Sequence, residues 1–377
     1  MKSLLSGGIA LGAILLTAAP SPGAPLSALT TFGGDGWLAP SEATFLQGAN
    51  LQRGMTYSAK NNHLYVVDRN GGTFVRIVDG DTGALVGSLD TTGITGGTFP
   101  LNMVDVDDDG VIYAASLNGD TDASVLKVYR WATEASLPTV AYDSSASPVA
   151  NGADIRIGDD LAVIGSGANT RIVTGGNSAT APGNPGDNAF VVLTTTDGLA
   201  YSAAVQDFVG VEPANGALRL GIDFVDANTV IGRQASGGEA IVATFAAGTA
   251  TQTALAELVV SGEAPLAVDR TNDLLATVQV IVPTGGVGAI NDVRLYDIAN
   301  PDSPILLDTQ NLTTSVAPVA NGNGTGDLKF GRFGGQFRLY VLNTNNGIQA
   351  FTVVPEPASL VLLACSGLAL ACRRRLG

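Results

Sequence analysis

The stretch RGMTYSAKNNHLYVVDRNGGTFVRIVDGDTGALVGSL, from Arg53 to Leu89, decides the fold. It contains short runs rich in β-branched and aromatic residues, and these runs are separated by Asn-Asn, Asn-Gly-Gly and Asp-Gly-Asp-Thr-Gly. Asn, Asp and Gly tolerate the backbone conformations of tight turns, and short apolar runs between such turns are typical of antiparallel strands. The stretch therefore predicts a small antiparallel sheet made of two successive hairpins.

The hairpin at the start of this stretch recurs along the chain. Six hairpins are expected in MTYSAKNNHLYVVD, MVDVDDDGVIYAA, ADIRIGDDLAVIG, LGIDFVDANTVIG, PLAVDRTNDLLATV and DLKFGRFGGQFRLYVL. Their last turn residues lie 48, 50, 68, 45 and 63 residues apart, at Asn62, Gly110, Asp160, Asn228, Asp273 and Gln336. The shorter spacings match one propeller blade of about 40–50 residues, and the longer ones contain insertions at 174–188 and 282–292.

These repeats predict an all-β fold, a β-propeller of six or seven blades with no helix outside the termini. The stretch LTTFGGDGWLAP, from Leu29, is expected to pair with the final blade and close the ring, because closure removes free sheet edges. A pair of β-sandwiches and a β-helix are the alternative architectures.

The carboxyl end of the chain has a different composition. An uncharged apolar run from Ala358 to Ala371 follows Pro355, Glu356 and Pro357, and it precedes Arg373, Arg374 and Arg375. As a helix, this run would span roughly 21 Å, less than the ~30 Å hydrocarbon core of a membrane. The arginines would stay on the cytoplasmic side. The tail therefore predicts a weak, transient membrane anchor, and a simple permanent anchor is the alternative.

This order of triplet, apolar run and arginines resembles the PEP-CTERM sorting domain. The resemblance implies recognition by an exosortase, removal of the tail after an inner-membrane intermediate, and delivery to the surface or matrix of a Gram-negative bacterium. The amino end agrees, since Lys2 precedes an apolar segment from Leu4 to Ala19, as in a signal peptide cut by signal peptidase. Cleavage after Gly23 or Ala28 is expected. We thus divide the chain into a signal peptide (1–28), a propeller-like extracellular domain (29–353) and a sorting segment (354–377).

Composition limits the function of the middle segment. The formal net charge of the chain is −15, and a strongly acidic surface repels nucleic acids. Both cysteines, Cys365 and Cys372, lie in the sorting segment, so the propeller is expected to be stable without disulfides. The middle segment also resembles a family of secreted bacterial proteins known only as a domain of unknown function. Shared stretches include GDGWLAP, the stretch quoted first and KVYRWA, and the resemblance covers Phe32 to Asp197.

Few residues suggest chemistry. His63 is the single histidine, which excludes multi-histidine metal centres, and its place beside a turn favours a strand-edge role. Asp105, Asp107 and Asp109, followed by Gly110, resemble the first half of a calcium loop, but the second half is missing. An ordinary hairpin turn is the competing interpretation. No catalytic or cofactor-binding residue is assigned, and Ca²⁺ is the single cofactor under consideration.

The sequence leaves two functional hypotheses. The first is a non-catalytic, exported propeller that binds or scaffolds extracellular polysaccharide or matrix protein. The second is a secreted hydrolase or lyase that acts on an extracellular carbohydrate or ester, with calcium as a candidate helper. The residues at the centre of the ring discriminate between them, because catalysis would need converging carboxylates or a metal.

Overall fold

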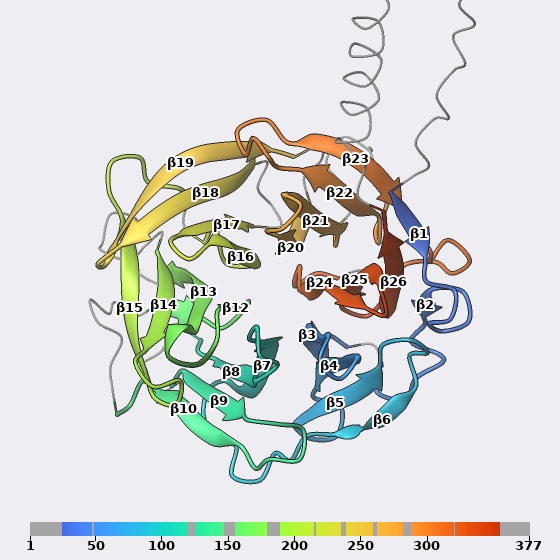
Figure 1. The fold of residues 1–377 in the computed structure, drawn as a ribbon, viewed down its shortest axis with the longest axis horizontal. Helices are drawn as coiled ribbons and strands as arrows, with labels where there is room; N and C mark the ends of the chain where they lie inside the picture. Colours follow the sequence, from blue (N-terminus) through green and yellow to red (C-terminus); the bar gives the residue numbers. More distant parts are fainter. Residues whose placement is uncertain are drawn as a thin grey trace, which may run out of the picture. The chain divides into compact units, whose positions relative to one another are not determined.

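The computed structural model describes residues 25–46, 49–119, 125–146, 155–178, 189–214, 216–234, 239–258, 262–281, 288–319 and 321–354. Within these residues the chain forms strands and one short 3₁₀ helix, η1 (Gly167–Asn169). The segment Pro25–Pro355 is one compact unit, in which small sheets are arranged like propeller blades around a central axis (Figure 1). No helix in the described ranges is long and apolar enough to cross a membrane.

Two of the sheets are simple four-stranded meanders in the first part of the chain. The stretch that decides the fold forms the first of them, as its turn residues predict. The first sheet contains β3 (Gln52–Ser58), β4 (His63–Asp68), β5 (Phe74–Asp79) and β6 (Leu85–Ser88). The second contains β7 (Phe99–Val106), β8 (Ile112–Leu117), β9 (Lys127–Trp131) and β10 (Thr139–Asp143).

A nine-stranded sheet follows, and it consists of two antiparallel meanders joined by a short parallel pairing of β15 with β19. Its first half contains β11 (Ile155–Ile157), β12 (Ala162–Ile164), β13 (Arg171–Ser178), β14 (Phe190–Thr195) and β15 (Tyr201–Phe208). Its second half contains β16 (Gly221–Asp226), β17 (Thr229–Arg233), β18 (Glu239–Ala246) and β19 (Thr249–Glu257).

The last two sheets complete the ring. One contains β20 (Glu263–Asp269), β21 (Leu274–Gln279), β22 (Val293–Asp297) and β23 (Ile305–Gln310). The other contains β24 (Gly326–Phe333), β25 (Gln336–Asn343), β26 (Ile348–Val353) and two strands from the start of the chain, β1 (Leu26–Ala28) and β2 (Trp37–Leu38). Because the first and last strands share a sheet, the pairing closes the ring between the two ends of the folded unit.

The closing strand lies partly where the sequence analysis places it. The segment after Leu29 contributes β2, but the longer pairing comes from Leu26–Ala28, which lie opposite Val353, Thr352 and Phe351 of β26. These three residues belong to the signal peptide in the division made from the sequence. The folded unit thus starts before the expected boundary at Ala28.

The hairpin predicted at Asp160 is wrong. β11 and β12 do not pair with each other; both pair with β13, so together they form one interrupted inner strand. The turn instead follows at 165–170, around η1. Gly158 adopts a φ of +95°, and this residue bends the strand just before Asp160. The other five predicted hairpins are present as β3–β4, β7–β8, β16–β17, β20–β21 and β24–β25.

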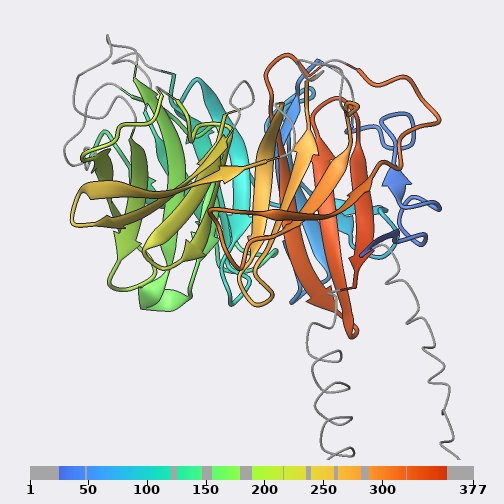
Figure 2. The same ribbon diagram turned by 90° about the horizontal axis from the view of Figure 1, so that it is seen from above.

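The inner strands contact one another in a closed order around the axis, namely β3, β7, β12, β16, β20, β24 and back to β3. Seen from the side, the inner strands run roughly along this axis (Figure 2). The apolar core lies between neighbouring sheets. Between the first two sheets, for example, Tyr65, Val67, Val104 and Trp131 are fully buried. Burial between sheets thus holds each blade to the next.

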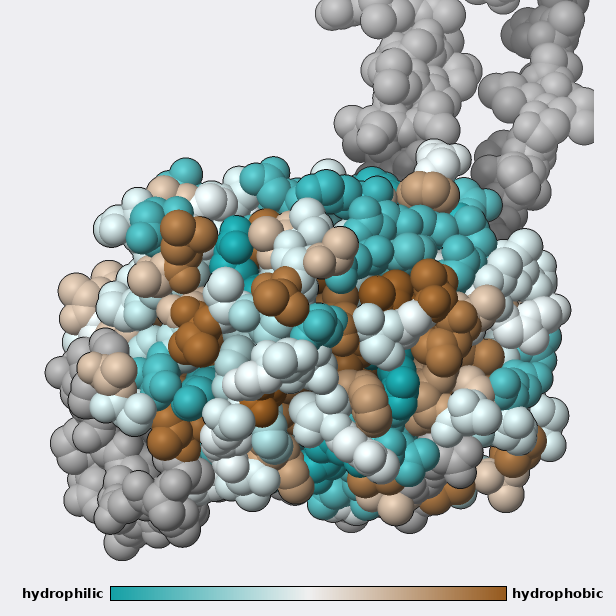
Figure 3. All heavy atoms as spheres, turned by 90° about the horizontal axis from the view of Figure 1, so that it is seen from below, coloured by the Kyte–Doolittle hydropathy of each residue, from teal (hydrophilic) through white to brown (hydrophobic). Residues whose placement is uncertain are grey.

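The outer flank of the ring is chemically mixed. Figure 3 shows apolar and polar residues interspersed over one side of the molecule. Several of the exposed large apolar side chains belong to the outer strands, including Leu85 and Val86 of β6 and Val140 of β10. Among the inner strands, β3 and β12 are buried along their whole length, whereas β16 and β24 become more exposed toward their last residues. Solvent-accessible polar side chains near the axis therefore lie mainly at the ends of the inner strands.

Candidate functional site

A pocket of about 260 Å³ lies where the inner strands end on one side of the ring. We call it the axial pocket. Turns of four hairpins, β3–β4, β7–β8, β20–β21 and β24–β25, surround it, and β12 and β16 contribute Val163 and Asp223. Propeller turns converge on the axis because every inner strand runs in the same direction toward this end. Residues far apart in sequence thus meet in one pocket.

The axial pocket contains both signs of charge. Its cationic side chains are Lys60, Arg270, Lys329 and Arg332, and its acidic side chains are Asp107, Asp108, Asp223 and Asp269. At the rim, Arg270 faces Asp108 and Arg332 faces Asp269, each at 3.5 Å. Arg332 donates a long hydrogen bond to Asp269, Arg270 is too far from Asp108 for a good one, and both arginines are substantially exposed. The rim arginines therefore keep donors for a ligand.

An aromatic pair forms one wall of the axial pocket. The rings of Phe330 and Phe337 stack with their centroids 5.4 Å apart. The guanidinium of Arg332 lies over the Phe337 ring, 4.0 Å from its centroid. Phe337 itself is buried, but the half-buried Phe330 ring beside hydrogen-bonding groups is an arrangement that fits an amphipathic ligand such as a sugar ring.

Lys329 lies at the base of the axial pocket, on β24. Its Nζ is 2.5 Å from Asp105 Oδ1, which also accepts a hydrogen bond from Thr56 Oγ1 at 2.6 Å. Burial alone would lower the pKa of Lys329, but the negative charges of Asp105 and Asp223 outweigh burial and raise it. The ammonium group is therefore held as the counterion of the carboxylates around the axis.

Four buried or partly buried aspartates around the axis link neighbouring inner strands at four of the six places where inner strands meet. One carboxylate oxygen accepts the N–H of the following residue, and the other accepts an N–H from the neighbouring inner strand. The second bonds measure 2.7, 2.5, 2.8 and 2.9 Å, in the pairs Asp105–Val163, Asp160–Ile222, Asp223–Val268 and Asp327–Met55. We call these residues the axial aspartates. Their first role is therefore to join blades.

Crowding of the axial aspartates changes their acidity. Burial raises the pKa of Asp160 to about 7, and the charges of Asp223 and Asp105 add to the effect. Burial also raises the pKa of Asp223 and that of Asp327, in the second case together with the charge of Asp160. Burial and the mutual repulsion of their charges thus favour the protonated forms of Asp160, Asp223 and Asp327.

The residues of the predicted calcium loop do not come together. Asp105 points toward Lys329 and the neighbouring strand, as described above. Asp107 accepts the N–H groups of Asp109 and Val111 with Oδ1, while Asp109 is exposed. Gly110 has a φ of +77°, so 107–110 form the β7–β8 hairpin turn. Among the described residues, no group of three or more His, Cys, Asp or Glu side chains has the arrangement of metal ligands.

Asp107 nonetheless has one unusual oxygen. Its Oδ2 is buried and has no hydrogen-bond partner within the described part of the chain. Burial raises the pKa of Asp107, and the nearby charge of Asp109 acts in the same direction. Since Asp107 also lines the axial pocket, it is the carboxyl group there with an uncommitted oxygen and a raised pKa.

Other residues singled out in the sequence lie away from this pocket or outside the description. His63 begins β4, and its Nδ1 lies 2.6 Å from Glu134 Oε1, which also accepts a hydrogen bond from Tyr65. His63 thus lies at the start of a strand that is paired on both sides, and its ring contacts the turn after β9. Pro355, Glu356, Pro357 and Arg373–Arg375 lie outside the described residues, as does the apolar segment near Lys2.

Sequence reasoning missed the axial aspartates as a group and missed Lys329 entirely. Two members of the group could have been recognised from the repeat, because Asp105 and Asp223 both stand five positions before the aligned turn residue. The misplaced turn at Asp160 hid the third member. No sequence pattern marks Lys329, since its importance comes from the carboxyl groups of Asp105, Asp223 and Asp327, which lie near it only in the folded ring.

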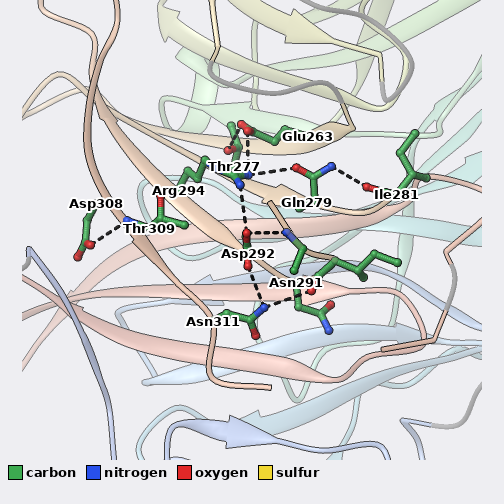
Figure 4. Close-up of polar contacts among 12 residues, drawn as sticks. Glu263, Thr277, Gln279, Ile281, Asn291, Asp292, Arg294, Asp308, Thr309 and Asn311 are labelled. Atoms are coloured by element: carbon green, nitrogen blue, oxygen red, sulfur yellow. Dashed lines mark hydrogen bonds and ion pairs between the residues drawn. The ribbon is translucent and has the colours of Figure 1, made fainter. Parts of the chain in front are cut away.

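A second polar cluster lies in the sheet β20–β23 (Figure 4). Arg294 donates from Nη1 to Glu263 at 2.9 Å and to Gln279 at 3.1 Å, and from Nη2 to Asp292 at 3.1 Å. Thr277 adds a hydrogen bond to Glu263 at 2.6 Å. Glu263 and Arg294 are almost completely buried. Because these partners satisfy one another, the cluster stabilises its sheet rather than offering a binding site.

Comparisons with solved structures agree with the fold. A DUF4623 family protein from Bacteroides eggerthii is similar with a TM-score of 0.56 and 16% identity, over 84% of this chain and 73% of the other. A gluconolactonase from Xanthomonas campestris, XC5397, is similar with a TM-score of 0.50 and 15% identity, over 89% of this chain and 97% of the other. At such identities the likeness concerns the fold alone.

No curated protein matches the chain significantly. One family model matches part of the chain, and this part spans the first two sheets and the start of the third. Residues 47–184 match the family described as "Domain of unknown function (DUF4623)", which here forms part of a propeller-like body.

Proposed function

We propose that this protein is an exported surface or matrix protein whose propeller binds an extracellular ligand in the axial pocket without catalysis. The arrangement of its innermost strands supports a six-bladed ring. The support for export is the signal-peptide pattern at the start of the chain and the Pro355–Pro357 triplet, apolar run and arginines at its end. In this proposal an exosortase removes the tail at the inner membrane.

The closing strand bears on where the signal peptide is cut. Cleavage after Ala28 would remove Leu26–Ala28 and with them the pairing to β26. Cleavage after Gly23 would retain it. We therefore propose that the mature protein starts at Ala24, and mass spectrometry of the secreted form tests this directly.

The observation that carries the binding proposal is that the carboxylates of Asp105 and Asp223 already have partners within the protein. Asp223, which faces the axial pocket, has both oxygens occupied by backbone N–H groups, and Asp105 at its base is paired with Lys329. Catalytic carboxylates need an oxygen free to exchange protons with a substrate. Apart from one oxygen of Asp107, the groups left free for a ligand are the rim arginines and the half-buried ring of Phe330, which suit saccharide binding.

Binding can be tested by isothermal titration with neutral and acidic oligosaccharides. Arg332→Ala removes the guanidinium above Phe337 and should weaken binding by about tenfold, the equivalent of one charged hydrogen bond. Arg171→Ala, in an arginine outside the axial pocket, is the matched control. Equal affinity of both variants and the original chain would contradict binding in this pocket.

Sorting needs a separate experiment. Glu356→Ala should leave the tail attached and the protein in the membrane fraction. The arginine-free variant, with Arg373, Arg374 and Arg375 replaced by Gln, should also be retained uncut. Release of a tail-less form from both variants would contradict exosortase processing.

A secreted hydrolase is the second candidate, and Asp107 is the observation that favours it. A raised-pKa carboxyl group with an uncommitted oxygen in a pocket can act as a general acid. The gluconolactonase named above shares the fold, so an aldonolactone is a sensible first substrate. Turnover that disappears in Asp107→Asn while ligand binding persists would favour this candidate over the non-catalytic one.

A further inference from the structure

A cluster of arginines lies at the other end of the inner strands. Arg53 is the second residue of β3, whereas Ser58, the last residue of that strand, lines the axial pocket. Five residues of extended chain separate them, which corresponds to about 16 Å. The arginine cluster and the axial pocket are thus separate places on the axis.

Three arginines from three parts of the ring surround one carboxylate there. Arg156 donates to both oxygens of Asp159, at 2.5 Å and 2.8 Å. Arg53 and Arg219 lie farther from the same carboxylate, at 3.9 Å and 3.7 Å. These longer distances allow charge attraction but no hydrogen bond. Arg156 thus holds both oxygens of Asp159, and among the described residues of the cluster three guanidinium groups face one carboxylate.

Arg53 and Arg219 each have a hydrogen-bond donor without an acceptor in the described part of the chain. The Nε atoms of both side chains are buried and have no hydrogen-bond partner among the described residues. Arg53 is only 7% exposed, and its guanidinium carbon lies 5.3 Å from the centroid of the Phe99 ring. A buried guanidinium without hydrogen bonds is costly, because burial removes water that would otherwise bind its donors.

The charges of the cluster repel one another. Burial lowers the pKa of Arg53 and of Arg219, and the neighbouring Arg156 lowers both further, although Asp159 opposes the effect. The side chains of Arg156 and Arg219 remain 32% and 22% exposed, so solvent reaches the outer part of the cluster. An anion entering from this side would meet two accessible guanidinium groups and the buried Arg53 behind them.

We propose that Arg53, Arg156 and Arg219 form a binding site for an oxyanion, a phosphate, sulfate or sugar carboxylate group. Guanidinium groups match the oxygens of such anions in geometry and charge. The oxygens of the ligand would accept hydrogen bonds from the unpartnered donors of Arg53 and Arg219. The negative charge of the ligand would neutralise the excess positive charge of the cluster. In a chain with a formal net charge of −15, this local concentration of positive charge gives an acidic ligand one defined place to bind.

Isothermal titration of the purified full chain with inorganic phosphate, sulfate and glucuronate tests the site, at constant ionic strength set with chloride. We expect one equivalent of at least one anion to bind. Arg53→Gln and Arg219→Gln should each raise its dissociation constant about tenfold. Arg171→Gln is the control for loss of one positive charge elsewhere and should bind as the original chain does.

The choice of anions separates the possible sources of the ligand. Binding of phosphate or sulfate alone indicates a tetrahedral group, and binding of glucuronate indicates an acidic sugar. If Arg53→Gln does not fold, Arg219→Gln and the charge-retaining Arg219→Lys decide, since only the first should lose most of the affinity. Failure of all three anions to bind, or unchanged binding in Arg219→Gln, would overturn the proposal whatever the axial pocket binds.

Discussion

At the scale of single residues, the axial aspartates make stability depend on pH. In the unfolded chain an aspartate loses its proton near its ordinary pKa of 3.8, but Asp160 in the folded ring keeps its proton up to about pH 7. Between these values the folded state holds more protons than the unfolded state. The free energy of unfolding therefore falls as pH rises through this window.

We expect the protein to be less stable at pH 8 than at pH 5, by about 3 kcal/mol from Asp160 alone. Urea unfolding at the two pH values measures the difference. Asp160→Asn cannot ionise, so its stability should depend less on pH, even if its absolute stability is lower. A variant with the original pH dependence would show that another group is responsible.

Lys329 is the second residue whose role depends on its surroundings. Lys329→Met keeps the length of the side chain but leaves Asp105 and Asp223 without their cation. Breaking a buried ion pair by removing one partner costs about 3–5 kcal/mol. Because the Lys329 side chain is 22% exposed, we expect a loss at the lower end of this range at pH 8. The loss should be smaller at pH 5, where Asp223, whose pKa is raised by burial, takes up a proton more readily.

Lys60→Met is the control for Lys329→Met. Lys60 also lines the axial pocket, but its Nζ donates to the exposed backbone oxygen of Asp109 at 3.0 Å. Its replacement should change the free energy of unfolding by no more than about 0.5 kcal/mol. Equal losses in the two lysine variants would argue against a special role of Lys329.

At the scale of elements, the short strand β1 has an effect larger than its length suggests. It pairs with β26, and its Leu26 is 2% exposed and packs in the same core cluster as Phe351 and Val353. A chain that begins at Leu29 would lose the three pairings and expose both partners. We expect the free energy of unfolding to fall by about 3 kcal/mol, mainly through lost burial of Leu26.

Thermal unfolding of chains that begin at Ala24 and at Leu29 measures this effect. Ser27→Ala in the longer chain is the matched control, because the Ser27 hydroxyl contacts Thr352 on the exposed side of the strand. It should leave the melting temperature nearly unchanged. Identical melting of the two chain lengths would mean that the pairing of β1 contributes little to closure.

At the scale of the whole molecule, repetition made the fold predictable. Hairpins such as β3–β4 and β16–β17 carry local turn residues, Asn62 and Asn228, that sequence reasoning can recognise. The interrupted inner strand β11–β12 was misread because Gly158, Asp159 and Asp160 have the composition of a turn. The carboxylates of the two aspartates instead contact groups far away in the sequence, such as the N–H of Ile222 and the side chains of Arg53 and Arg219.

Contacts between residues far apart in the sequence also explain why the candidate sites were harder to predict than the fold. Asp105, Asp107 and Asp109 are close in sequence, and that closeness suggested calcium. In the ring, each has a different environment, since one faces Lys329, one closes a turn and one is exposed. Arg53 and Arg219 are 166 positions apart (219 − 53) and gave no signal, because only ring closure brings them to one carboxylate.

At the scale of the whole molecule we also expect that calcium does not stabilise this protein through a specific site. A specific site with calcium at about 100 times its dissociation constant would raise the free energy of unfolding by about 2.7 kcal/mol. The axial aspartates already have Lys329 and backbone N–H groups as partners, so we expect chelation with EDTA to leave the melting temperature unchanged. Because the chain carries a net charge of −15, any divalent cation also screens its self-repulsion. Magnesium at equal concentration is therefore the control, and a rise in melting temperature with calcium but not with magnesium would contradict the expectation and restore the calcium loop as a site.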